Sequence, residues 1–308
     1  MTLNFTSLLN AMPGAIAQGL IWGVMAIGVY VTYKVLDFAD LTVDGSMATG
    51  GAVCIMLMMA GWNTWLALLV AIIAGMLAGL ITGIFHTAMG IPPILSGILT
   101  QLSLYSINLT IMLGKANQAV NVTKYNLIVS SRYVRDMSRQ NPIWTTLLII
   151  AVLIAILYWF FGREIGAALR ATGANEAMSR AQGINTNRCK VLGLMISNGI
   201  VALTSAMLSH YQGFVDVNMG RGAIVIGLAA VIISQVIFSK LFRNFAAKLF
   251  GVALGAVIYY IVIQIVLWLG LNTNLLKMLS ALIVAVVLAI PFWKGKLDAR
   301  RKGGKTNA

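Results

Sequence analysis

Long apolar stretches separated by short polar connections run through the whole chain. A helix that crosses the hydrocarbon core of a bilayer needs about 20 mostly apolar residues. Nine stretches approach this length: residues 15–36, 45–61, 64–86, 91–113, 143–161, 191–211, 223–238, 249–269 and 275–293. The pattern therefore predicts an all-α, polytopic transmembrane helical bundle of about eight to ten spans.

Three of these stretches are typical of short or broken helices. Residues 45–61 and 223–238 are shorter than a full span, and residues 91–113 begin at Pro92 and Pro93. Interrupted helices in membrane proteins usually lie beside a cavity. We therefore expect functional residues next to these stretches.

Small residues recur four positions apart within several stretches, a spacing that lets helix backbones approach closely. We interpret them as packing positions within one subunit in preference to a dimer face. They are Gly19 and Gly23, then Gly75, Gly79 and Gly83, and finally Gly251 and Gly255.

The composition supports a membrane protein. Hydrophobic residues make up 59% of the chain and charged residues only 10%, whereas soluble domains are about a quarter charged. The net charge is +14. In a membrane protein such an excess of Lys and Arg marks the cytoplasmic side, so we expect a lipid bilayer and no nucleic acid as the partner.

The basic residues predict an orientation. With nine spans, Lys34, the connection 162–190, residues 240–248 and the tail 294–308 share one side, which carries fifteen Lys and Arg against seven on the other. The positive-inside rule makes that side cytoplasmic, although the opposite connection 114–142 holds five of the seven. We expect one domain over 1–293 in a bacterial plasma membrane, with a basic cytoplasmic tail over 294–308.

The chain lacks the motifs of common catalytic sites. It has no G-x-x-x-x-G-K-[ST] phosphate-binding loop, and its two histidines, His86 and His210, have no partner at metal-ligand spacing. We therefore expect no catalysis, cofactor or metal. The central parts of the spans hold almost no carboxylates, which argues against an ion-coupled secondary transporter, the alternative function.

The connection 162–190 contains the signals of a short helix. Asn175 is a good N-cap, Glu176 carries a negative charge at the positive helix end, and Gly183 suits the residue after the C-cap. These signals predict a helix over residues 176–182.

A helix of two turns is marginal alone in water, so another surface must hold it. Ala177 and Ala181 lie four residues apart and form a small apolar face. Two interpretations are equally compatible with these residues. The helix either lies on lipid headgroups or docks in a cleft of a cytosolic partner.

Several stretches together resemble one protein family. Their pattern is similar to that of ABC importer permeases of the branched-chain amino acid and ribose type, over roughly residues 15–270. The residues that carry the resemblance are 168–185, with A-L-R-A-x-G-x-N-x-x-x-S-x-A-x-G-I-N, and 40–46, 92–96, 211–220 and 226–231. Residues 40–46 and 211–220 are most similar to a branch that is paired with lipoprotein binding proteins and associated with aromatic amino acids such as tryptophan.

The resemblance implies a permease subunit that works with other proteins. A separate cytosolic ABC ATPase would hydrolyse ATP, and an external or lipoprotein solute-binding protein would deliver a small solute. The expected solute is an amino acid, and an aromatic amino acid is the narrower expectation. A second copy of the permease would complete a homodimer. The ATPase would hold a coupling helix formed by Gly173, Asn175, Glu176, Ala177, Arg180, Ala181 and Gly183.

Candidate pathway residues are the polar side chains within or next to the apolar stretches. For each one, the structural alternative is a hydrogen bond between helices, worth about 0.6–2 kcal/mol. The candidates are Asp44, Ser46, Gln101, Asn108, Asn198, Asp216 and Asn218.

Overall fold

A computed structural model describes residues 5–122, 124–125, 127–134, 141–239, 241–270, 275, 278, 280–286 and 289. The fold is the predicted all-α membrane bundle. Seven described helices are long and apolar enough to cross a bilayer: α1 (Phe5–Tyr30), α2 (Thr42–Met59), α3 (Thr64–Thr87), α4 (Pro93–Ile111), α5 (Pro142–Phe161), α8 (Thr186–Gln212) and α10 (Phe245–Trp268). The predicted tail 294–308 lies outside the described residues, and so do residues 276–277, 279, 287–288 and 290–293 of the predicted last span.

Shorter elements complete the fold. A π-helix, η1 (Val31–Val35), extends α1, and a 3-10 turn, η2 (Ser131–Tyr133), lies before α5. Helix α9 (Ala223–Phe238) is the shorter apolar helix that the sequence predicts. The remaining elements are α6 (Glu164–Ala174), α7 (Glu176–Ala181), β1 (Asn117–Ala119) and β2 (Phe214–Asp216).

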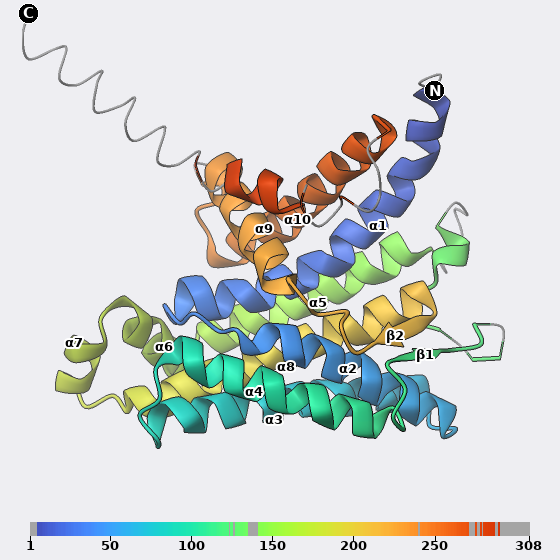
Figure 1. Ribbon diagram of the computed structural model, residues 1–308. Helices are drawn as coiled ribbons and strands as arrows, with labels where there is room; N and C mark the ends of the chain where they lie inside the picture. The colour runs from blue at the N-terminus through green and yellow to red at the C-terminus, as the bar shows by residue number, and fades with distance from the viewer. Residues whose placement is uncertain are drawn as a thin grey trace, which may run out of the picture.

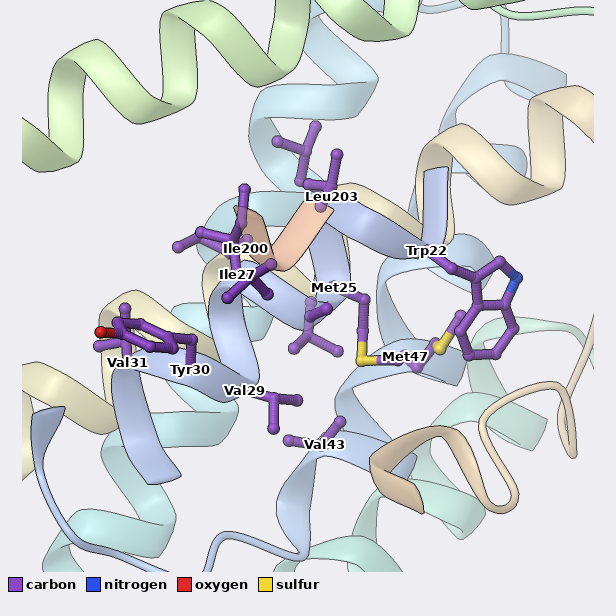
Figure 2. Close-up of a cluster of buried hydrophobic side chains, with 14 of the residues drawn as sticks. Trp22, Met25, Ile27, Val29, Tyr30, Val31, Val43, Met47, Ile200 and Leu203 are labelled. Carbon is purple, nitrogen blue, oxygen red and sulfur yellow. The ribbon is translucent and has the colours of Figure 1, made fainter. Parts of the chain in front are cut away.

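Helix α8 lies at the centre of the bundle, where it packs against α1, α2 and α3, while α10 packs against α1 and α9. The core is apolar. Figure 2 shows Met25 of α1, Met47 of α2, and Ile200 and Leu203 of α8 within one buried cluster. Helices α6 and α7 project from one end of the bundle, and the β1–β2 pair lies at the other (Figure 1).

Glycines bring these helices together. A Cβ atom on Gly79 would overlap the backbone of Leu194, and one on Gly23 would press on Ala253. The glycines of α3 therefore face α8, and those of α1 face α10. This arrangement confirms that the repeated small residues serve packing within the chain.

The connection between α8 and α9 turns back into the bundle. Strand β2 pairs antiparallel with β1, with Asn117 opposite Asp216. Val215 is fully buried and lies next to Gly51 in the middle of α2. Gly220 then reaches the backbone of Asp44. Helix α9 thus begins inside the bundle beside the start of α2, as expected for a broken helix next to functional residues.

Candidate functional site

A buried polar cluster joins the start of α2 to the middle of α8. Asn198 donates from Nδ2 to Oδ2 of Asp40 at 2.7 Å, and its Oδ1 accepts from the Ser46 hydroxyl at 2.6 Å. The backbone N–H of Thr42 donates to Oδ1 of Asp40 at 2.9 Å. All four residues are buried. Because buried polar groups are costly when unpaired, this network fixes α2 against α8.

Three threonines extend the cluster to neighbouring helices. The Thr42 hydroxyl lies 2.6 Å from the Thr82 hydroxyl, which donates to the Thr100 hydroxyl at 2.8 Å. These residues link α2, α3 and α4 by hydroxyl groups that are at most 1% exposed. Thr82 and Thr100 lie on regular apolar helices, so the sequence offers no local signal that would single them out.

Asp44 lies one turn further along and caps another helix. Its carboxylate accepts from the backbone N–H groups of Gly222, at 2.9 Å, and Ile224, at 3.1 Å. Gly222 is the N-cap residue of α9 and Ile224 is the second residue of that helix, so the carboxylate lies at the helix N-terminus, where a negative charge is favourable. Gly222 has φ +83°, a left-handed conformation that glycine adopts without strain.

The structure therefore brings four of the seven predicted pathway residues into hydrogen bonds between elements: Asp44, Ser46, Asn198 and Asp216, whose Oδ2 accepts from Nδ2 of Asn117 in β1 at 3.4 Å. Ser46 and Asn198 are fully buried, and Asp44 is partly exposed. These contacts are hydrogen bonds within the protein, which is the structural alternative to contact with the solute. Asp40 holds the cluster together but was not among the candidates.

Gln101, Asp216, Asn108 and Asn218 have different surroundings. Gln101 is partly exposed, and its Cα approaches Gly45. Asp216 accepts from the backbone N–H of Asn218 at 2.7 Å. Asn108 is fully buried. Among the described residues, its side-chain nitrogen and oxygen have no hydrogen-bond partner, and neither has the side-chain oxygen of Asn218.

At the α6–α7 end, the predicted short helix is present. Asn175 caps α7 by accepting from the backbone N–H of Met178 at 3.0 Å. Helix α7 covers Glu176–Ala181, one residue less than predicted, and Gly183 follows with φ +80°. The local capping prediction is thus confirmed.

Ionic contacts fasten α7 to the start of α8. Glu176 pairs with Lys190 at 2.8 Å and with Arg180 at 2.6 Å. The hydrogen bond from Lys190 is the main reason why the pKa of Glu176 lies below its ordinary value. Arg180 also donates from Nε to the Thr186 hydroxyl at 2.9 Å. The two-turn helix is therefore held at both ends.

The segment also touches the end of α1 directly. A Cβ atom on Gly173 would overlap the carbonyl oxygen of Val35 in η1, so a larger residue cannot occupy this position. By contrast, Ala177 and Ala181 are exposed, and Met178 is 63% exposed. One side of the segment therefore packs against the bundle, and the other side is exposed.

The comparisons with known proteins agree with this geometry. Residues 12–288 match the family model described as branched-chain amino acid transport system / permease component. The tyrosine transport system permease protein of Clostridioides difficile (strain R20291) is 36% identical over 300 residues, which cover 97% of this chain and 96% of that protein. The ribose import permease protein of Escherichia coli (strain K12) is 22% identical over 231 residues, covering 75% of this chain and 70% of that protein.

One solved structure shares the fold. A chain of the structure titled "PsaBC from Streptococcus pneumoniae in complex with Fab" matches with a TM-score of 0.54 at 14% identity, covering 94% of this chain and 95% of that chain. At this identity the likeness concerns the fold alone. Together with the family match over nearly the whole chain, the helical bundle establishes that this multi-pass membrane protein belongs to the branched-chain amino acid and ribose type of ABC transporter permeases.

Proposed function

We propose that this chain is the transmembrane subunit of an ABC importer and forms the pathway for a small solute. A separate cytosolic ATPase would supply the energy, and an external solute-binding protein would deliver the solute. The observation that carries this proposal is the docking segment, residues 162–190. It combines a capped helix anchored to α1 and α8 with an exposed face that has no partner among the described residues.

The anchoring supports a mechanical role for the docking segment. Glu176 connects α7 to α8 through Lys190, and Gly173 packs against Val35 at the end of α1. A partner that moves α7 would therefore move two helices of the core. Helices that lie on lipid headgroups usually carry several large apolar side chains, whereas the exposed face of α7 has one, Met178, between Ala177 and Ala181, which leave room for a protein cleft.

The pathway is proposed to run beside the starts of α2 and α9. Partly exposed polar residues at this place, Asp44, Gln101, Asp216 and Asn218, are suited to contact a passing solute. Buried Ser46, Asn108 and Asn198 would shape the pathway wall. In this proposal residues 1–293 form the membrane domain, the tail 294–308 is cytoplasmic, and a second copy of the chain completes a homodimer in a bacterial plasma membrane.

The proposed solute is an amino acid, and an aromatic amino acid is the narrower expectation. The name of the 36% identical relative, a tyrosine transport system permease protein, supports this choice. Reconstituted transporter should then take up labelled tyrosine, tryptophan or phenylalanine in preference to ribose. Equal or better uptake of ribose would contradict the amino-acid assignment while leaving the transport role intact.

A pair of charge reversals tests the docking segment. Glu176 and Glu164 are the only glutamates of the chain, and each is the first residue of a helix, α7 and α6. Only Glu176 forms ion pairs among the described residues. We expect Glu176→Lys to abolish transport-coupled ATP hydrolysis, whereas Glu164→Lys should retain most of it.

The measurement is ATPase activity and solute uptake by the complex in proteoliposomes, with membrane insertion checked for both variants. Normal coupling in Glu176→Lys would contradict the docking role of α7. Uptake by the chain alone under an ion gradient, without any ATPase subunit, would instead favour a secondary transporter.

A further inference from the structure

A large basic cavity lies where α1, α5, α6 and α10 come together, next to the docking segment. Its volume is about 1010 Å³. Five cationic side chains line it, and they come from segments far apart in the sequence: Lys34, Arg163, Arg170, Arg243 and Lys248. The lining contains no Asp or Glu. We call this space the basic cavity.

Among the described residues, the cations of the basic cavity have no anionic partners. In the part of the chain that the structure describes, ion pairs form only between Glu176 and its two partners, Arg180 and Lys190. Five positive charges around one space repel each other unless an anion lies among them. The cavity is thus built for a ligand with negative charge.

The position of the cavity identifies the source of that charge. Its rim includes Tyr158, 50% exposed, and Trp159, 61% exposed, on the last turn of the largely exposed apolar helix α5. Exposed Tyr and Trp at the end of a spanning helix mark the headgroup level of a bilayer. Arg163 lies 5.1 Å from the Trp159 ring, at the same level. The cavity therefore opens towards lipid headgroups.

A second, smaller cavity continues from the first. It has a volume of about 410 Å³ and shares Tyr30, Lys34 and Lys248 with the basic cavity. Its other walls include the rings of Phe238 and Phe242. Cations next to aromatic side chains suit a molecule that has a charged head and an apolar chain.

We propose that the basic cavity binds the headgroup of an anionic phospholipid from the leaflet on the side of the docking segment. The phosphate lies among the five cations, and an acyl chain extends along Phe238 and Phe242 or along α5. Basic pockets between membrane helices are suited to such headgroups. This site is separate from the proposed pathway and does not depend on which solute is carried.

A double variant tests the site without altering the docking segment. Lys34→Gln combined with Arg243→Gln removes two of the cavity cations. The matched control, Lys115→Gln combined with Arg221→Gln, removes two exposed cations that line no described cavity and lie outside the docking segment. Binding is measured on the full chain in nanodiscs by native mass spectrometry, with phosphatidylglycerol compared with phosphatidylcholine.

We expect the wild type and the control to retain phosphatidylglycerol in preference to phosphatidylcholine. The double variant should bind phosphatidylglycerol about 30-fold more weakly, at roughly fivefold for each cation near the membrane surface. If the double variant does not fold, each single variant should still weaken binding about fivefold. Thermal stabilisation by phosphatidylglycerol provides a second readout and should decrease in the same order.

Four results would overturn the proposal. One is equal binding of the two lipids by the wild type, and another is equal binding of phosphatidylglycerol by the double variant and the control. The third is displacement of the lipid by millimolar inorganic phosphate, which would assign the cavity to a free anion. Loss of the lipid when the ATPase subunit binds would likewise assign the cavity to a protein interface.

Discussion

The carboxylate of Asp44 on α2 accepts a hydrogen bond from the backbone N–H of Gly222, which lies 178 residues further along the chain. A second bond from Ile224 completes the cap of α9. The starts of α2 and α9 are therefore joined by one side chain. If α2 moves relative to α9, these two hydrogen bonds must break, or the two helix starts must move together.

The Asp44 cap leads to the first prediction. Asp44→Ala leaves two N–H groups of α9 without an acceptor, so we expect the free energy of unfolding to fall by about 1–2 kcal/mol. Asp44→Asn keeps one acceptor oxygen and should lose less. Thermal unfolding of the three proteins in the same detergent checks this order. An Asp44→Ala protein as stable as the wild type would show that the cap contributes nothing.

The sequence predicts α7 well because its signals are local. The cap, the charge and the final glycine lie within nine residues, from Asn175 to Gly183. The lengths of the apolar stretches likewise predict the helical bundle and the short helix α9. Both kinds of signal act within one element and need no knowledge of its neighbours.

The hydrogen bonds of the polar cluster cannot be predicted from such local signals. Asp40 and Asn198 pair across 158 residues, and nothing near either residue indicates the other. The same holds for the cap of α9 by Asp44. The sequence identifies these positions only as polar groups at membrane depth, and the fold decides whether such a group contacts a helix or a solute.

Glycine packing gives the second prediction. Gly79→Ala should lower the free energy of unfolding by about 1–3 kcal/mol, because the new methyl group overlaps the backbone of Leu194 and forces α3 away from α8. Gly14→Ala is the matched control, since its Cβ would meet only the Tyr211 hydroxyl at 3.9 Å. The control should be neutral or more stable by about 0.5–1 kcal/mol. Similar effects of both substitutions would contradict close packing at Gly79.

The pairing of Glu176 gives a pH dependence. Its pKa is lowered, mainly by the hydrogen bond from Lys190, so the ionised form is favoured in the folded segment. The stabilisation of α7 is therefore fully present above the ordinary carboxyl pKa of 4.5 and is lost as the pH falls through the lowered value. Hydrogen exchange of residues 176–190, corrected for intrinsic rates, should show this loss of protection. The variant Glu176→Gln should show no such change, and identical profiles would contradict the role of the ion pair.

The two buried asparagines of the candidate pathway give the final prediction, because their surroundings are opposite. Asn198 bonds Asp40 and Ser46, whereas the amide of Asn108 has no partner among the described residues. Asn198→Leu removes the partner of Oδ2 of the buried Asp40 carboxylate and of the buried Ser46 hydroxyl, so we expect a loss of about 3 kcal/mol or more in the free energy of unfolding. Asn108→Leu removes an amide whose hydrogen bonds are unmade, and the protein should be as stable as the wild type or more stable.

Measurements of solute uptake distinguish a structural role of each asparagine from a role in the solute pathway. A buried amide without hydrogen-bond partners destabilises the protein. The presence of Asn108 in the wall of the proposed pathway is explained if its amide forms hydrogen bonds with the solute. We therefore expect Asn108→Leu to reduce uptake in proteoliposomes at least tenfold at unchanged protein level and thermal stability. Asn198→Leu should lose uptake and stability together. Full uptake by a stable Asn108→Leu protein would remove Asn108 from the pathway.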